Sequence, residues 1–318
     1  MSRRKNQFWK VFCVAAAIGS MAGFAQGADL IPLNETTWDA AAPQGKEVDC
    51  IYGDWVLRNN RIVVVIANAT KGRNANMTVR NVGGSVIDLT LRDEQSDQLS
   101  AYYPLNANYD LTTPGNEGGE LTAKSKPASG PNLSLTFRGK AEDEKSTAEV
   151  TYTLADDEPR LKIVTRVTNT SDQPLDIGAL DSIRADGEFE FSQVDGLGLF
   201  LAYDPYWRQA YGVLTADPAA KIVGSAMKRG DKPDLRIEGK GLQGAIAPGG
   251  VREVVRYLYP AANSLDALSS ARELRGEKLK QIDLKVVDPA GPIERADVLV
   301  TTAKGEKVGH GQTNAQGV

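Results

Sequence analysis

The sequence of 318 residues contains very little of the nitrogen and sulfur chemistry on which many enzymes depend. It has one histidine, His310, and two cysteines, Cys13 and Cys50. Zinc sites, Ser-His-Asp sites and Cys-His sites each need several such groups close together. We therefore expect no metal ligands, no cofactor and no catalytic residues of these kinds in the sequence. We interpret Cys50 as a buried thiol and His310, which lies between two glycines, as a solvent-exposed turn residue.

Basic clusters and phosphate-binding loops are also missing. Lys and Arg number 37 and Asp and Glu number 41, which gives a formal net charge of −4. An acidic chain is poorly suited to neutralising phosphates, so we expect no nucleic-acid partner. Gly196-Leu-Gly198 lacks the third glycine and the following helix of a dinucleotide-binding loop. The acidic runs beside loops at 142–144 and 156–158 are typical of solvated surface.

The first 27 residues have the composition of a targeting signal. Basic residues at positions 3, 4, 5 and 10 precede the short apolar stretch Val11–Ala25, and Ala25-Gln26-Gly27 follows the small-any-small pattern of a signal peptidase site. We predict a signal peptide over 1–27 and an exported protein, periplasmic or extracellular, with no membrane span after cleavage. A retained anchor is the alternative. Cleavage at Ala28 leaves a net charge of 33 − 41 = −8.

Alternating apolar and polar residues predict strands over most of the remaining sequence. The alternation is clearest over Leu161–Thr168, and it recurs over Val150–Leu154 and Leu133–Phe137. Ile62–Ile66 is instead continuously apolar and β-branched, which indicates a central strand covered on both faces. In Val86–Leu91 the pattern places Ile87, Leu89 and Leu91 on one face and Asp88 and Thr90 on the other. With turn residues between these runs, the sequence predicts an all-β fold, namely a large β-sandwich over 28–262.

The rest of the chain has a different character. Asn106–Pro131 is rich in Gly, Asn, Pro, Thr and Ser, which predicts a long surface loop. A single helix is expected to connect two units over 263–278, because Asn263 or Ser264 can cap it and Gly276 can end it. After the helix, strands are predicted over Leu279–Val287 and Ala296–Thr302. Too few strands follow for a stable unit, so we expect 279–318 to be a truncated small β-domain.

One loop gathers aromatic residues with polar handles. Within nine residues that follow an apolar strand, the chain carries four aromatic rings, an acid and a base. Such residues suit a sugar-stacking platform or a partner-binding surface, although they can equally wall the core. The candidate ligand-binding residues are Tyr203, Tyr206, Trp207, Arg208 and Tyr211.

The segment Asn68–Gly84 is rich in asparagine and ends in Gly83-Gly84. Two glycines permit a bulge or a close backbone approach. Asparagines that pin loops and asparagines that bind a ligand both fit the pattern.

Parts of the sequence resemble three known families. Gly53–Asn59, Arg73–Gly84 and Asp97–Pro104 are similar to the N-terminal region of large exported planctomycete-type, and so bacterial, proteins that carry a CehA/McbA-type metallohydrolase domain related to the PHP phosphoesterases. Leu284–Val318 resembles the first half of a carboxypeptidase-regulatory-like Greek-key domain. The alternation in Val82–Leu89 and the strand pair over Glu149–Asn169 are also similar to the galactose-mutarotase-like supersandwich. The catalytic members of that family use histidines with a glutamate, and those histidines are missing here.

These observations leave three hypotheses. The first is a non-catalytic exported β-scaffold or interaction module, the N-terminal part of a larger metallohydrolase-type protein, whose partners are the downstream domains of the same chain. The second is a carbohydrate-binding sandwich that uses the aromatic loop. The third is a histidine-free polysaccharide-active enzyme in which Asp181, Asp186 or Asp204 meets Tyr206 or Arg208.

Overall fold

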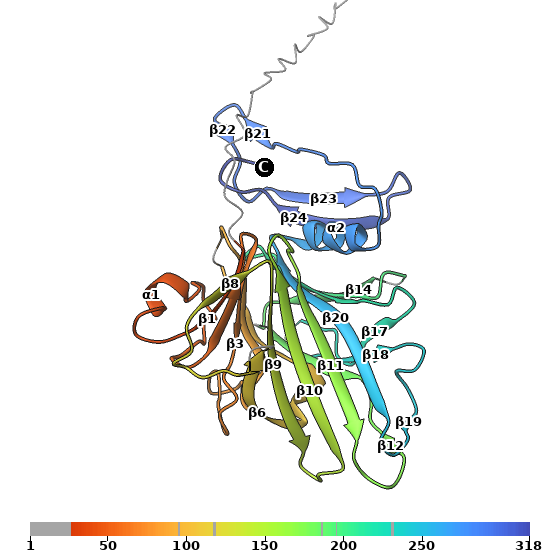
Figure 1. Ribbon diagram of the computed structural model, residues 1–318. Coiled ribbons are helices and arrows are strands. Elements are labelled where there is room, and N and C mark those ends of the chain that lie inside the picture. The colour runs from red at the N-terminus through yellow and green to blue at the C-terminus, as the bar shows by residue number, and fades with distance from the viewer. Residues whose placement is uncertain (1–26, 95, 117–118, 186, 195, 230–231) are drawn as a thin grey trace, which may run out of the picture.

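The computed structural model describes residues 27–318 except 95, 117–118, 186, 195 and 230–231. Two antiparallel nine-stranded sheets within this part of the chain make up a sandwich (Figure 1). The first sheet contains, in spatial order, β17 (Lys221–Gly224), β18 (Asp234–Glu238), β13 (Leu180–Ala185), β5 (Leu99–Tyr103), β4 (Val86–Leu91), β3 (Ile62–Ile66), β2 (Trp55–Arg58), β1 (Ala28–Pro32) and β8 (Ala128–Gly130). The second contains β14 (Glu190–Val194), β15 (Leu199–Asp204), β16 (Gln209–Thr215), β20 (Val251–Ala261), β11 (Leu161–Asn169), β10 (Ser146–Ala155), β9 (Asn132–Ala141), β6 (Tyr109–Asn116) and β7 (Gly119–Glu120). The predicted all-β fold with a large β-sandwich is confirmed.

The principal core lies between the sheets, because alternate residues of each strand point inward. Along β10 every second side chain from Ser146 onward is buried, and β11 repeats the pattern in antiparallel register with Val150 opposite Thr165. Inward side chains of both sheets form one continuous apolar cluster that includes Trp55, Phe137 and Phe200. Burial of apolar area on this scale is the main source of stability for a fold without a disulfide between described residues.

The first sheet is covered on both faces. Ile62 and Val64 of β3 join the principal core, whereas Val63 and Val65 belong to a second core on the opposite face. The segment 33–54 with helix α1 (Trp38–Ala41) and the segment 67–85 supply the cover. The prediction of a central strand buried on both sides is therefore confirmed.

The prediction for Val86–Leu91 was right for Leu89 and Leu91, which both face the principal core, but wrong for Ile87. A register shift opposite Val65 and Ile66 places Val86 and Leu89 in the principal core but Ile87 in the second core. Because both faces are covered, Asp88 is fully buried as well. A strand alternates between inward apolar and outward polar side chains only when one face of its sheet is exposed to solvent.

Asn106–Pro131 is not a loop throughout, as the composition had predicted. It contains β6, β7 and β8, and β6 pairs with β9 from Tyr109 to Gly115. Gly139 permits the close approach of the two strands, since a Cβ there would lie 2.4 Å from the carbonyl oxygen of Asp110. The pairing partner thus overrides the weak strand propensity of the segment.

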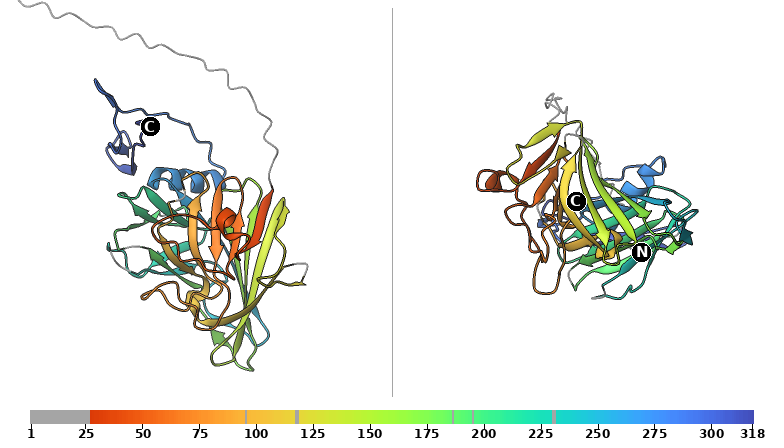
Figure 2. Two further views of the ribbon diagram at one scale, coloured as in Figure 1. Left: turned by 90° about the vertical axis from the view of Figure 1, so that its left-hand side faces the viewer. Right: turned by 60° about the horizontal axis from the view of Figure 1, so that its bottom comes forward.

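Helix α2 (Ser264–Leu274) lies within the range 263–278 in which a helix was predicted. The Asn263 side chain accepts hydrogen bonds from the backbone N–H groups of Leu265 and Asp266, both at 2.9 Å, and Gly276 follows with a φ of +76°. Its apolar side, with Ala267, packs on β15, β16 and β20 at one end of the second sheet. The rest of the outer face of that sheet is not covered by any described element (Figures 1 and 2).

A C-terminal unit follows α2. It contains two ribbons, β21 (Val287–Asp288) with β22 (Gly291–Pro292) and β23 (Asp297–Thr301) with β24 (Lys307–Gln312), while β12 (Leu175–Asp176) and β19 (Ala245–Ile246) pair inside the sandwich unit. The strand predicted over Ala296–Thr302 is thus present as β23. The strand predicted over Leu279–Val287 does not form, because residues 279–286 have no partner strand among the described residues. His310 lies in β24 and is partly buried, so its assignment to an exposed turn was wrong.

The predicted signal peptide lies outside the described residues except for Gly27. None of the helices in the described part of the chain has the length and apolar character needed to cross a bilayer.

Candidate functional site

The aromatic loop does not bring its five predicted ligand-binding residues to one surface. Tyr203 and Tyr211 are buried, and the Tyr211 hydroxyl donates to Asp97 at 3.3 Å inside the sandwich. Tyr206 and Trp207 are exposed, with ring centroids 5.3 Å apart. Only these two aromatic rings of the loop are therefore placed to contact a ligand.

The exposed part of the loop faces the C-terminal unit. The Arg208 guanidinium donates to the Thr313 carbonyl at 3.3 Å, and the Arg295 guanidinium lies 5.1 Å from the centre of the Tyr206 ring. His310 packs edge-on against Tyr203 at 4.9 Å. In this structure the loop is part of the contact between the sandwich and the C-terminal unit.

The acids of the third hypothesis have structural roles where they are described. Asp204 accepts from the backbone N–H groups of Tyr206 and Trp207 at 2.8 and 3.0 Å, and so shapes its own loop. Asp181 is buried and accepts from Arg256 at 2.6 Å. Asp186 lies outside the described residues. Both carboxyl oxygens of Asp181 are therefore bound to structural partners. Asp204 is fully buried and uses one oxygen in this way, while its Oδ2 has no hydrogen-bond partner among the described residues.

A different place gathers the polar groups of a binding site. Three hollows of about 560, 790 and 240 Å³ follow one another along β6 and the β9–β10 hairpin. The first and second share Thr112, Gly139 and Lys140, and the second and third share Asn108 and Tyr109. Shared wall residues make the three hollows neighbours along β6, and we call them together the β6 groove.

The first hollow lies on the uncovered face of the second sheet. A row of outward side chains crosses three strands there: Arg138 of β9 stands opposite Glu149 of β10, and Glu149 opposite Arg166 of β11. Arg138 and Glu149 form an exposed ion pair of 2.8 Å. Lys140 forms no ion pair with a described residue, so this end of the groove offers a cation to a ligand.

The second hollow lies between the segment 70–83 and the hairpin. Asn81 and Gly83 come from the asparagine-rich segment that the sequence singled out. Asn108, just before β6, and Glu142, in the hairpin, line the same hollow. Gly83 fits closely, since a Cβ there would be 3.3 Å from the Cα of Ala69. Amides, carboxylates and hydroxyls converge on this space from both sides.

Backbone strain is concentrated around the groove. Seven non-glycine residues of the described chain have positive φ, and three of them, Asn81, Ala107 and Glu144, line the second hollow. Leu105, at φ +60°, lines the third. Non-glycine residues in this region cost of order 1–2 kcal/mol each and persist where the surroundings hold them. Four of the seven residues with positive φ therefore belong to the walls of the second and third hollows.

A buried ion pair holds the left-handed turn η1 (Pro104–Ala107) that starts the groove. Asp181 accepts from the backbone N–H of Leu105 at 2.9 Å, from the Tyr102 hydroxyl at 2.6 Å and from Arg256 at 2.6 Å. Arg256 also donates to Thr165 at 2.9 Å. Asp181 belongs to the first sheet and Arg256 to the second, so the network joins the two sheets. Through Leu105 it also holds η1, which forms part of the groove wall.

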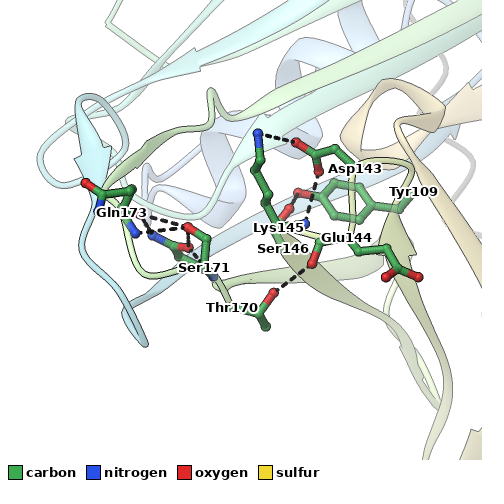
Figure 3. Close-up of polar contacts among 9 residues, drawn as sticks. Tyr109, Asp143, Glu144, Lys145, Ser146, Thr170, Ser171 and Gln173 are labelled. Carbon is green, nitrogen blue, oxygen red and sulfur yellow. Dashed lines mark hydrogen bonds and ion pairs between the residues drawn. The ribbon is translucent and has the colours of Figure 1, made fainter.

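The hairpin wall is braced in a similar way (Figure 3). The Tyr109 hydroxyl lies 3.0 Å from the Ser146 hydroxyl, and burial raises the pKa of Tyr109. Thr170 donates to the Glu144 carbonyl at 3.2 Å, and Asp143 accepts from the backbone N–H of Lys145 at 3.1 Å. The Tyr109 ring therefore stands fixed between the second and third hollows.

Buried carboxylates lie elsewhere, beneath the loops that cover the first sheet. Asp54 accepts from the Ile51 and Asn68 backbone N–H groups at 2.8 Å each and from Arg73 at 3.0 Å. Burial raises the pKa of the Cys50 thiol far above its ordinary value, so this buried cysteine is a poor nucleophile. In the residues described, no group of three or more His, Cys, Asp or Glu side chains has an arrangement that could hold a metal ion.

Comparisons with known proteins give structural likenesses alone. No protein-family model matches the chain, and no curated protein matches it significantly. The chain is similar to a TPR-domain containing protein from Parabacteroides distasonis, with 12% identity and a TM-score of 0.47 over 74% of this chain and 50% of that one. It is also similar to a heparan sulfate lyase from Pedobacter heparinus (12%, TM-score 0.38, 68% and 36%) and to a galactose mutarotase-like protein from Lactobacillus casei (11%, TM-score 0.37, 66% and 100%). The chain thus spans half or less of the first two proteins.

Proposed function

We propose that the chain is a carbohydrate-binding module that holds an extended glycan along the β6 groove. The observation that carries the proposal is the succession of three neighbouring hollows, each of which shares wall residues with the next. An open, elongated and polar surface suits several sugar units in a row better than one enclosed small molecule.

The wall chemistry supports a sugar ligand. Sugar hydroxyls both donate and accept hydrogen bonds, and Asn81, Asn108 and Glu142 supply both kinds of partner. The braced ring of Tyr109 offers an amphipathic wall against which the C–H face of a sugar can pack. Lys140 adds a cation at the junction with the sheet face, which favours glycans that carry carboxylate or sulfate groups.

A glycan array with the purified chain, followed by calorimetric titration of the best ligand, tests the proposal. Lys140→Ala and Asn108→Ala are expected to weaken binding about tenfold or more, in line with the loss of one hydrogen bond to a charged group or of two neutral ones. Lys162→Ala is the matched control, because Lys162 is an exposed cation on the same face outside the three hollows.

Trp207→Ala separates the groove from the aromatic loop. Under the proposal this variant binds like the wild-type chain. Affinity lost in Trp207→Ala and kept in both groove variants would move the site to the loop around Tyr206, and absence of binding to any polysaccharide would reject a carbohydrate function.

A protein-interaction role is the second candidate, and the C-terminal unit supports it. Several of its large apolar side chains are exposed, among them Ile282, Leu284, Val287 and Leu299. Clustered exposed apolar groups are typical of surfaces that bind other polypeptide. The proposals of a larger metallohydrolase-type protein and of a carboxypeptidase-regulatory-like domain rest on the sequence resemblance, and reading the gene beyond the codon for Val318 tests both.

The exported location is likewise a proposal, supported by the composition of residues 1–27. Amino-terminal sequencing of the protein recovered from periplasm or medium is expected to begin at Ala28. A retained amino terminus in a membrane fraction would favour the anchor instead.

A further inference from the structure

Residues 280–286 have the sequence of a strand without its partner. Ile282, Leu284 and Val286 alternate with Gln281, Asp283 and Lys285, yet no backbone hydrogen bond involves residues 278–285 within the described chain. Ile282 is 83% exposed and Leu284 47%. Figures 1 and 2 show this stretch running from the end of α2 to β21, on the side of the C-terminal unit away from the sandwich. An extended, exposed and apolar segment with unpaired backbone groups can form hydrogen bonds with a strand of another chain.

One edge of the stretch is already in use near its end. The Val286 N–H donates to the Gly317 carbonyl at 2.8 Å, and the Val286 carbonyl accepts from Ile293 at 3.0 Å. Successive residues of an extended chain direct their N–H and C=O groups to opposite edges. Val286 and the other even-numbered residues therefore face the edge that is already in use. If residues 281–287 are extended, the N–H and C=O groups of the odd-numbered residues point to the opposite, free edge.

We propose that a second copy of the chain pairs with this free edge, antiparallel and about a twofold axis at Leu284. In that register the backbone hydrogen bonds between the two copies run between odd-numbered residues. These are the residues whose N–H and C=O groups point to the free edge. Leu284 then meets its own counterpart, and Ile282 meets Val286, so the exposed apolar face becomes continuous across both copies. Such an interface is isologous, as twofold symmetry requires.

The charges fit the same register. Asp283 stands opposite Lys285 of the second copy, and Lys280 stands opposite Asp288. Symmetry repeats each pair, so four pairs of opposite charge are formed and no like charges face each other among these positions. Opposite charges directly across an antiparallel pair stabilise it, whereas like charges destabilise it. This complementarity selects a second copy over an arbitrary strand.

Light scattering coupled to gel filtration on the full chain, over increasing concentration, tests the proposal. The expected mass is about twice 34.2 kDa at the highest concentration. Asp283→Lys and Lys285→Asp each place like charges opposite one another twice, so each variant alone is expected to weaken dimerisation at least tenfold. An equimolar mixture of the two variants restores opposite charges at all four positions and is expected to dimerise.

Lys304→Asp is the control, because this residue lies in the β23–β24 turn and outside the register. It is expected to dimerise like the wild-type chain. A wild-type chain that stays monomeric would overturn the proposal. So would a dimer that survives Asp283→Lys, or a mixture of the two charge variants that stays monomeric although each variant melts like the wild type.

Discussion

The stability of this protein is expected to fall as pH rises from 5 to 8, and the buried carboxyl group of Asp88 is one cause. Asp88 is fully buried on β4, where its Oδ1 accepts from the Asp49 backbone N–H at 2.7 Å. Its Oδ2 has no hydrogen-bond partner among the described residues. Burial, reinforced by the charges of Asp49 and Asp54, raises the pKa of Asp88 from 3.8 to about 8. Asp97, whose pKa burial and Asp88 also raise, acts in the same direction.

The sign follows from proton binding in the two states. Between pH 3.8 and about 8 the folded state holds a proton on Asp88 that the unfolded state releases. The stabilisation by the neutral form is therefore complete below pH 3.8 and is lost as pH rises through about 8. Linkage gives about 1.4 kcal/mol per pH unit for one such proton, or about 4 kcal/mol between pH 5 and pH 8. That is a large share of the stability of an ordinary domain.

Asp88→Asn tests this reasoning, because the amide has the shape of the neutral carboxyl group and its oxygen can still accept from Asp49. Urea unfolding at pH 5, 6, 7 and 8 gives the free energy of unfolding of both proteins. The free energy of unfolding of the variant, relative to that of the wild type, is expected to rise by about 1 kcal/mol or more with each pH unit. Asp39→Asn is the control, since Asp39 is exposed on α1 and the same chemical change there removes no buried carboxyl group.

A constant difference between Asp88→Asn and the wild type across this pH range would refute the argument. It would mean that Asp88 is ionised in the folded protein, and hence that solvent or a counter-charge reaches the carboxyl group.

Three further predictions concern the supports of the fold and of the groove. Arg256→Met leaves Asp181 buried and unpaired and is expected to cost about 3–5 kcal/mol in urea unfolding, part of which Asp181→Asn in the same chain restores. Asn263→Ala removes the cap of α2 and is expected to cost about 1 kcal/mol by the same measurement. Gly311→Val places a Cβ 2.9 Å from the Cβ of Asn263, so hydrogen exchange is expected to show loss of protection in 307–312 with the sandwich unchanged.

The parts of the fold that depend on local pattern could be predicted from the sequence. The alternation over Leu161–Thr168 is strand β11, and the β-branched run Ile62–Ile66 is a strand buried on both faces. Asn263 and Gly276 bound the helix as their chemistry requires. In each case the residues carry the information themselves, through side-chain direction or through a cap.

The groove could be predicted only in part, because its walls come from distant segments. The asparagine and glycine content of 68–84 was a signal, and Asn81 and Gly83 do line the second hollow. Tyr109 and Lys140 gave no such signal, because nothing near them in sequence shows that β6 pairs with β9. The aromatic loop gave the strongest signal, but packing places Tyr203 in the core and turns the loop toward the C-terminal unit.

The stretch 280–286 shows why a correct pattern can still give a wrong strand. Its alternation is as regular as that of β11, but β11 has β10 on one edge and β20 on the other. A strand is a property of a pair, since its backbone groups must find partners on a neighbour. Asn106–Pro131 is the converse case, in which a sequence of low strand propensity becomes β6 because β9 is available. Strand propensity therefore decides little when no partner strand is available. A segment with a regular strand pattern but no partner strand is the place where we expect this chain to pair with a second copy.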